Sequence, residues 1–200
     1  MTTAKRGKLI AFEGIDGSGK STQWARLGEW LKAQGRDVVL SFEPTKRPHG
    51  QWLRDAWASG IRLPVDEEKA LFDADRREHI DEVIQPSLDR GQIVLLDRYY
   101  YSSAVYQGTR KGETPEAVLR HYEAFCPRPD VVLLFDLPVE LALKRMQSSR
   151  SNLDAMEVSD NLETVRNAYL NLNRPEIVVV DASGSPDEVW DGVLRHAREW

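Results

Sequence analysis

The sequence predicts an α/β fold in which a five-stranded parallel sheet is flanked by helices on both faces. Short apolar runs alternate with helical patterns along the 200 residues, and this alternation is typical of parallel sheets. The runs are continuously apolar, as expected for strands that helices cover on both sides. No internal repeat or low-complexity tract interrupts the pattern. We therefore expect a single domain over residues 1–200.

Five apolar runs are the expected strands. They are rich in Val, Ile, Leu and Phe, and they lie at residues 9–12, 38–40, 93–96, 131–135 and 177–180. Open parallel sheets bind ligands at the carboxyl ends of their strands. The residues that follow these runs are therefore the first candidates for a functional site.

Helical patterns fill much of the space between and after the strands. Gly35 stands where the first helix would end, and Pro86 is expected to kink a long charged helix. The last helix has a clear start, because Ser185 can cap it, Pro186 fits its first turn and Glu188 completes a capping box. The apolar faces consist of Trp24, Leu27 and Leu31, of Ile80, Ile84 and Leu88, and of Leu162, Val165, Tyr169 and Leu172.

A glycine-rich loop connects the first strand to the first helix. It reads GIDGSGKS and fits the pattern G-x-x-x-x-G-K-[ST]. Glycines let the backbone direct N–H groups at phosphate oxygens, and the helix N-terminus adds a positive dipole. Lys20 can reach the β- and γ-phosphates, and Ser21 can bind Mg²⁺. The pattern predicts a P-loop NTPase fold that binds ATP through Gly14, Asp16, Gly17, Ser18, Gly19, Lys20, Ser21 and Thr22. By itself, the loop does not separate a kinase from a GTPase or another ATPase.

The third expected strand ends in Asp97 and Arg98. A carboxylate at this edge of the sheet can hold Mg²⁺ through water or orient an attacking phosphate. Arg98 can clamp a phosphate with two hydrogen bonds. We therefore expect Ser21 and Asp97 to bind the metal, and a surface salt bridge is the alternative interpretation of the Asp-Arg pair.

Together these motifs resemble those of the thymidylate kinase family. EGIDGSGKSTQ, FEPT, ADR and DRYYYSSAVYQG occur in the family's order and spacing, and the resemblance extends from about residue 8 to the C-terminus. The phosphate loop is generic, whereas the pattern DRYxxSSxxYQG is characteristic of the family. The resemblance implies a kinase that transfers the γ-phosphate of ATP to dTMP, with Mg²⁺, to give dTDP and ADP.

The resemblance also implies which residues bind the acceptor. Phe72 would stack on the base, Arg76 would bind a base carbonyl, and Arg98 would bind the acceptor phosphate. Tyr106 would crowd the sugar 2′ position and so favour deoxyribose. The remaining implied acceptor residues are Glu43, Ser103 and Gln107. Asp16 would lie near the acceptor, and Glu13 near the metal.

Members of the family close a lid over the reaction, and here the lid would cover about residues 145–160. Such a lid screens the phosphoryl donor from water. Gly17 occupies a position at which some members carry a basic residue, and members without that residue place the catalytic arginine in the lid. Arg150 is the leading candidate and Arg145 the alternative. The implied catalytic set is Lys20, Arg98, Asp16 and Arg150.

Two departures from the family pattern concern positive charge. Residues 154–157 read DAME where the usual motif is D-R-[FY]-E, and Phe42 precedes Glu43 where many relatives carry arginine. Lys46, Arg47 or Arg54 would have to supply the positive charge that an arginine before Glu43 provides in those relatives. The departures leave two alternatives open: a kinase for another pyrimidine deoxynucleoside monophosphate, modified or unmodified, or a nucleotide-binding regulator with weakened catalysis.

Composition narrows the class of partner. The net charge of -5 argues against a dedicated nucleic-acid binder, which is usually basic. The single cysteine, Cys126, excludes an intramolecular disulfide and fits a reducing cytosol. No apolar run approaches the ~20 residues of a membrane span. We expect a cytoplasmic enzyme that acts on small nucleotides and binds neither nucleic acid nor membrane. As in the family, we expect it to form a homodimer.

Overall fold

A computed structural model describes residues 6–110, 112–147, 155–198 and 200, and for residues 155–160 it describes the backbone only. Its five parallel strands form one sheet in the order β2-β3-β1-β4-β5, which confirms the predicted fold class. Each expected strand is present and continues one or two residues further at its carboxyl end. The strands are β1 (Lys8–Glu13), β2 (Val38–Phe42), β3 (Ile93–Asp97), β4 (Val131–Asp136) and β5 (Ile177–Asp181).

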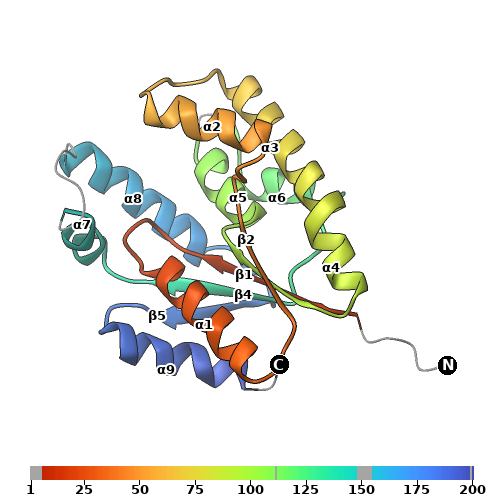
Figure 1. Cartoon of the computed structure of the whole chain (residues 1–200). Helices are drawn as coiled ribbons and strands as arrows, with labels where there is room; N and C mark the ends of the chain where they lie inside the picture. The colour runs from red at the N-terminus through yellow and green to blue at the C-terminus, as the bar shows by residue number, and fades with distance from the viewer. Residues whose placement is uncertain (1–5, 111, 148–154, 199) are drawn as a thin grey trace.

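Helices cover both faces of the sheet (Figure 1). On one face, α1 (Lys20–Ala33) and α9 (Pro186–Ala197) contact the strands and each other. On the other face lie α4 (Gln85–Asp89), α5 (Tyr100–Gly108) and α8 (Ala155–Leu170). Around this core are α2 (Pro48–Ala58), α3 (Val65–His79), α6 (Pro115–Glu123) and α7 (Val139–Gln147).

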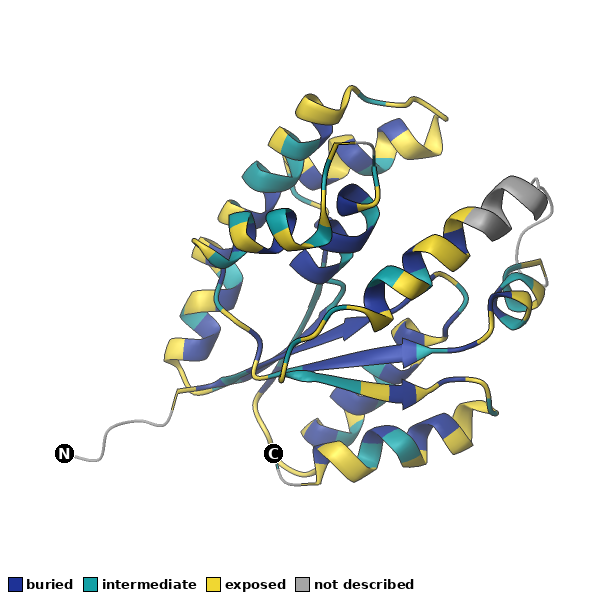
Figure 2. Cartoon of the chain, turned by 180° about the vertical axis from the view of Figure 1, so that it is seen from behind, coloured by how far each residue is buried: buried dark blue, intermediate teal, exposed yellow. Residues whose placement is uncertain are grey.

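The sheet centre is the most deeply buried part of the molecule (Figure 2). The side chains at positions 9–12 of β1 and 94–96 of β3 are fully buried, whereas only one residue of the edge strand β5 is buried. Because β1 pairs with β3 so that Phe12 lies opposite Asp97, the two strands end side by side. The glycine loop after β1 and the Asp-Arg pair of β3 are therefore neighbours, although about 80 residues separate them in the sequence.

The long charged helix is interrupted where the sequence predicted a kink. Between α3 and α4 lies a π-helical turn, η1 (Ile80–Ile84), and Pro86 is the second residue of the helix that follows. Proline lacks an N–H donor and its ring crowds the preceding turn. A wider turn just before it is one way in which a helix accommodates both effects.

Four of the described helices, α2, α5, α6 and α7, had no counterpart among the predicted elements. Helix α2 buries only Gly50, Leu53 and Ala56, so it has no apolar stripe to reveal it. Helix α6 begins with a cap, because the side chain of Thr114 accepts a hydrogen bond from the backbone N–H of Ala117. The predicted capping box of α9 is confirmed, since Ser185 and Glu188 bond each other's backbone groups. No helix in the described parts of the chain is long and apolar enough to cross a membrane.

Candidate active site

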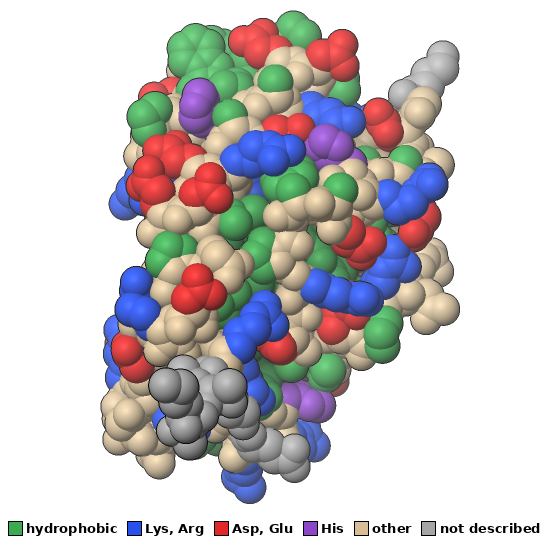
Figure 3. All heavy atoms as spheres, turned by 90° about the vertical axis from the view of Figure 1, so that its right-hand side faces the viewer, with side chains coloured by type: hydrophobic (Ala, Val, Ile, Leu, Met, Phe, Trp, Pro, Cys, Tyr) green, Lys and Arg blue, Asp and Glu red, His purple; other side chains and the backbone are tan. Residues whose placement is uncertain are grey.

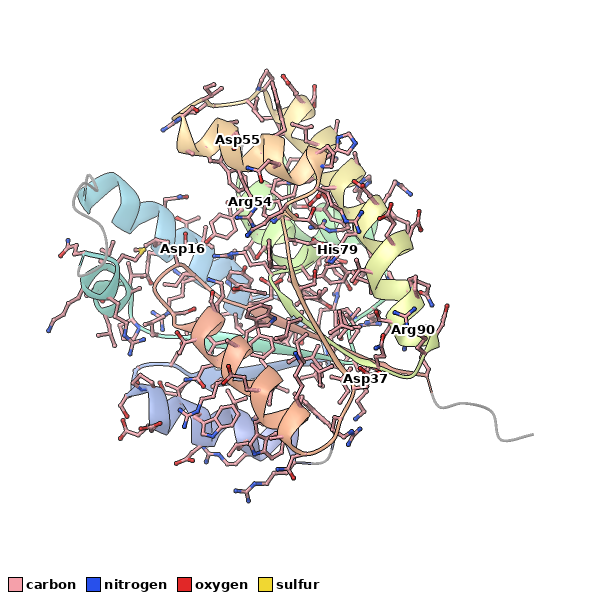
Figure 4. The ribbon with its side chains drawn as sticks, viewed as in Figure 1. Asp16, Asp37, Arg54, Asp55, His79 and Arg90 are labelled. Carbon is pink, nitrogen blue, oxygen red and sulfur yellow. The ribbon has the colours of Figure 1, made fainter. Side chains whose placement is uncertain are left out.

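A cavity of about 650 Å³ opens at the carboxyl edge of the sheet. It extends from the glycine loop and the end of β3 to helices α2, α3 and α5. Asp16 of the loop and Arg54 of α2, which both line it, are labelled in Figure 4. The predicted loop residues Lys20 and Ser21 and the predicted strand-end residues Asp97 and Arg98 all line this one cavity.

The glycine loop depends on backbone geometry that only glycine adopts without strain. Gly14, Gly17 and Gly19 have φ angles of 140°, 80° and 81°, in the region that L-residues rarely adopt. A Cβ on Gly14 would lie 2.6 Å from the backbone oxygen of Phe135, and one on Gly17 would lie 2.5 Å from that of Ala142. The loop is thus packed against the end of β4 and against α7, and position 17 has no room for a basic side chain.

Lys20 lies buried at the base of the cavity. Its ammonium nitrogen is 3.6 Å from the Asp16 carboxylate and 3.5 Å from the backbone oxygen of Ile15. Burial lowers the pKa of Lys20 to about 8, and the Arg98 guanidinium adds to this effect, while Asp16 and Asp97 oppose it. Bound phosphate groups would favour the charged form, so the site is suited to an anionic ligand.

The other predicted loop residues differ in exposure. Ser21 and Thr22 are exposed at the start of α1. The hydroxyl of Ser18 is buried and has no hydrogen-bond partner among the described residues. The oxygen donors of Ser21 and Asp97 at one cavity wall are of the kind that Mg²⁺ prefers.

Arg98 lies directly beside the glycine loop at the cavity. Its guanidinium donates to Asp16 at 2.5 Å and to Ser102 at 2.9 Å, and lies 5.4 Å from the centre of the Tyr106 ring. Its φ of 69° is unusual for a residue other than glycine, and such strain concentrates at functional sites. Burial alone would lower the pKa of Arg98, but the oxygens of Tyr106 and Asp16 raise it well above its ordinary value. Arg98 therefore carries a permanent positive charge.

Glu13, which we expected near the metal, ends β1 beside the glycine loop. Its carboxylate is fully buried and accepts hydrogen bonds from the backbone of Tyr99 and the hydroxyls of Ser102 and Tyr169. Burial raises the pKa of Glu13, although the hydrogen bond from Ser102 opposes the shift. Its observed role is to fix the turn between β3 and α5, which carries Arg98.

Arg76 and Glu43 form a buried pair in the wall opposite the glycine loop. The Nε of Arg76 donates to Glu43 at 2.7 Å, and its Nη2 donates to Ser103 at 3.1 Å. Burial would raise the pKa of Glu43, but the Arg76 charge and the contact with His79 outweigh it and leave the pKa lowered. The remaining nitrogen of Arg76, Nη1, is buried without a partner in the described structure. Because buried donors are nearly always hydrogen-bonded, this nitrogen is suited to donate to an acceptor atom of a bound ligand.

Aromatic and amide side chains complete the same wall. Phe72 lines the cavity, and its ring centre lies 5.9 Å from that of Trp57 at an angle of 43°. Gln107 also lines the cavity, and within the part of the chain that is described neither its amide nitrogen nor its amide oxygen has a partner. A flat apolar ring beside unpaired polar groups is an arrangement that fits a nucleobase.

Of the three residues that could replace the missing arginine, Arg54 alone lines the cavity. It donates to the backbone oxygen of Pro44 at 2.9 Å, and its guanidinium lies 5.0 Å from the Phe42 ring centre. Arg47 instead pairs with Glu78 and Glu82, and Lys46 is exposed.

Sequence reasoning gave no site role to seven further residues of the cavity lining: Phe42, Pro44, Trp57, Glu68, Tyr99, Ser102 and Arg110. Glu68 and Arg110 form an ion pair between α3 and the end of α5.

Trp57 is 46% exposed and is accompanied by the exposed Trp52, Ile61 and Val65. Hydrophobic side chains gather at the top of the molecule, where α2 and α3 meet (Figure 3). The signal in the sequence was the i, i+3 spacing of Arg54 and Trp57, which places both on one face of a helix.

The predicted lid is only partly described. Arg145, at the end of α7, donates to the backbone oxygens of Ala182 at 2.9 Å and Gly184 at 2.8 Å. It therefore holds the loop before α9. Arg150 lies outside the described residues, so its catalytic role stays a prediction, as does the lid itself.

The fold and the site define a P-loop phosphotransferase with room for a second ligand beside the donor site. Comparison with known proteins gives the family: the family model for thymidylate kinase matches residues 12–193. The chain is 45% identical to the thymidylate kinase of Akkermansia muciniphila, over 94% of this chain and 90% of the relative. It is 41% identical to that of Desulfotalea psychrophila, over 96% and 95%, and 48% identical to that of Xanthomonas oryzae pv. oryzae, over 92% and 79%. The chain belongs to the thymidylate kinase family and is a nucleoside monophosphate kinase.

Proposed function

We propose that the protein transfers the γ-phosphate of ATP to dTMP, giving dTDP and ADP. The observation that carries this proposal is that residues of the glycine phosphate loop, Arg98, Arg76 and the Phe72 ring line one and the same cavity. The donor nucleotide would lie on the loop, and the acceptor would lie against the opposite wall. Arg98 and Arg54 place positive charge at the cavity that an acceptor phosphate would neutralise and a bare nucleoside would not, so the geometry favours a phosphorylated acceptor.

Positions in the wall suggest how the acceptor is held. Phe72 would stack on the base, while Arg76 Nη1 and the Gln107 amide would meet its polar edge, because these buried groups have no hydrogen-bond partner among the described residues. Arg98 and Arg54 would bind the acceptor phosphate. Tyr106, below the Arg98 guanidinium, would limit the space beside the sugar. Glu43 and Ser103 would act by holding Arg76 rather than by touching the acceptor.

Transfer itself requires positioning and charge neutralisation. An ionised oxygen of the acceptor phosphate attacks the γ-phosphorus in line, the bond to the ADP oxygen breaks, and no strong general base is needed. Lys20 and Arg98 neutralise charge that spreads over the transferring group. Ser21 and Asp97 would hold Mg²⁺, which adds positive charge to the donor phosphates when bound. Asp16 would keep Lys20 and Arg98 apart and oriented, because it contacts both.

A substrate screen tests the proposal. ADP release is followed with ATP and Mg²⁺ and with dTMP, dUMP, dCMP, dAMP or dGMP as acceptor, and a reaction without acceptor gives the background. We expect the highest kcat/KM with dTMP. If no pyrimidine monophosphate raised ADP release above the background, the proposed function would be wrong.

A further inference from the structure

His79 lies at the end of α3, behind the acceptor wall (Figure 4). Its side chain is 1% exposed and makes two close polar contacts. Nε2 is 2.7 Å from the hydroxyl oxygen of Ser41, and Nδ1 is 3.0 Å from Oε1 of Glu43. The described cavity lining includes Glu43 but neither His79 nor Ser41. The imidazole therefore reaches the site only through Glu43.

The direction of these two hydrogen bonds follows from the chemistry of the partners. The lowered pKa of Glu43 keeps its carboxylate ionised, and an ionised carboxylate only accepts hydrogen bonds. Nδ1 must then carry a proton and donate it. In the neutral ring Nε2 is an acceptor, and the Ser41 hydroxyl donates to it. Both ring nitrogens are thus satisfied within the protein.

The contact extends to the unpartnered nitrogen of Arg76. The two oxygens of Glu43 are held separately, one by His79 Nδ1 and the other by Arg76 Nε. A carboxylate held at both oxygens has one orientation, and it sets the orientation of the Arg76 guanidinium together with the Tyr122 ring, whose centre lies 4.1 Å from the guanidinium carbon. On the far side, Ser103 accepts from Nη2. The remaining nitrogen, Nη1, is thereby held in place for a ligand.

The hydrogen-bonded chain Ser41–His79–Glu43 contains the residue types of a catalytic triad: a hydroxyl, an imidazole and a carboxylate. Their placement in the fold argues against a role of Ser41 as a nucleophile. Ser41 lies within β2, opposite Leu96 of β3, and its hydroxyl is directed at the imidazole rather than at the cavity. A substrate bound in the cavity meets Glu43 and Arg76 first. The arrangement is suited to orientation, not to covalent catalysis.

We propose that His79 is a positioning residue for the acceptor: by donating from Nδ1 to Glu43, it holds Arg76 Nη1 in the orientation that binds the base. This inference rests on the proposed function of the same cavity. It makes the His79–Glu43 contact a determinant of acceptor affinity, with little effect on ATP, which would bind on the other side of the cavity. The His79–Ser41 contact serves only to orient the ring.

Two substitutions of His79 separate its two nitrogens. In His79→Asn the amide nitrogen takes the place of Nδ1, so the donation to Glu43 is kept and the contact with Ser41 is lost. In His79→Gln the amide reaches the place of Nε2, so the contact with Ser41 is kept and the donation to Glu43 is lost. Ser41→Ala is the matched control, because it removes the Ser41 contact while leaving the imidazole in place.

The readout is KM and kcat for dTMP and KM for ATP in all four proteins. We expect His79→Gln to raise the KM for dTMP about tenfold, in line with the loss of one buried charge-assisted hydrogen bond, while the KM for ATP stays within about twofold. His79→Asn and Ser41→Ala should stay within about twofold for both substrates. Equal effects of Asn and Gln, or an equal rise in both KM values, would show a merely structural role.

Stability is followed in parallel by thermal unfolding. Should the Gln variant not fold, His79→Ala removes both contacts without adding bulk, and the same selective rise in the KM for dTMP is required of it. The wild-type enzyme separates the two proposals. If it turns over dTMP and the selective rise is missing, only the His79 inference fails. If it does not turn over dTMP, both the proposed function and this inference fail.

Discussion

The two ends of the cavity are built in different ways. The donor end is a run of consecutive residues, 14–21, whose backbone shape follows from glycine and from close packing on β4 and α7. The acceptor end is assembled from side chains of β2, α2, α3 and α5, which are held by buried polar contacts. The first relies on backbone conformation and the second on a side-chain network. We therefore expect substitutions at the two ends to act on different substrates.

The largest effect is expected at the donor end. Lys20→Ala removes the buried ammonium group nearest the phosphate loop, and we expect kcat to fall about a thousandfold, as for other groups that neutralise charge in a transition state. Lys32→Ala, on the exposed side of the same helix, is the control and should have no effect. Circular dichroism checks that the fold is intact. A folded Lys20→Ala variant with near-normal turnover would contradict the assignment.

Arg98→Ala should produce the next largest effect, on the acceptor side. It removes a permanently charged guanidinium from the cavity, and we expect kcat/KM for dTMP to fall about a hundredfold, as for the loss of a charge-assisted contact with phosphate. Steady-state kinetics with each substrate varied in turn give this value. Arg128→Ala, whose side chain pairs with Glu176 outside the cavity, should behave like the wild type. An unchanged affinity for dTMP would rule out the proposed role.

The pH dependence of the kinetic parameters tests the donor end without any substitution. The pKa of Lys20 is lowered to about 8 by burial, so in the free enzyme its charge is lost as the pH rises through this value. We expect kcat/KM for ATP to fall about tenfold per pH unit above pH 8, because this parameter reports the free enzyme. Bound ATP favours the ammonium form, so kcat should decline only at higher pH. A kcat/KM for ATP that stays flat to about pH 9.5 would contradict the expected titration.

The smallest effect is expected at the rim of the acceptor end. Trp57→Leu removes an aromatic ring that lies against Phe72, and we expect the KM for dTMP to rise about threefold, in the range of one aromatic contact. Because Trp57 is partly exposed, dTMP should also change the wild-type tryptophan fluorescence, and this change should shrink in the variant. Trp52→Leu, an exposed position on the same helix that the cavity lining does not include, is the control. Equal fluorescence responses in both variants would exclude Trp57 from the base site.

The same contrast explains what the sequence could predict. The strands are continuous apolar runs and the phosphate loop is a contiguous motif, so both can be recognised from neighbouring residues. The sheet order then brings Asp97 and Arg98 beside the loop, because β1 and β3 pair in parallel. The acceptor residues came from a family resemblance, since no local pattern links α2, α3 and α5.

The parts of the site that the sequence left open have physical reasons. Glu13 is adjacent to the phosphate loop in the sequence, but it belongs to β1, and its buried carboxylate accepts hydrogen bonds from Tyr99 and Ser102. Adjacency to a motif does not tell on which side of a strand a side chain lies. Trp57 was missed because α2 buries too few residues to give an apolar stripe. The roles of Arg150 and of the lid depend on residues outside the described structure.

The close approach of Gly17 to α7 has an evolutionary consequence. The backbone oxygen of Ala142 occupies the place where a side chain at position 17 would begin. A point mutation that introduced a lysine or arginine there would not simply add a charge, because the backbone of α7 would first have to retreat. A basic residue at position 17 would therefore require a change in the packing of α7 as well as the substitution itself.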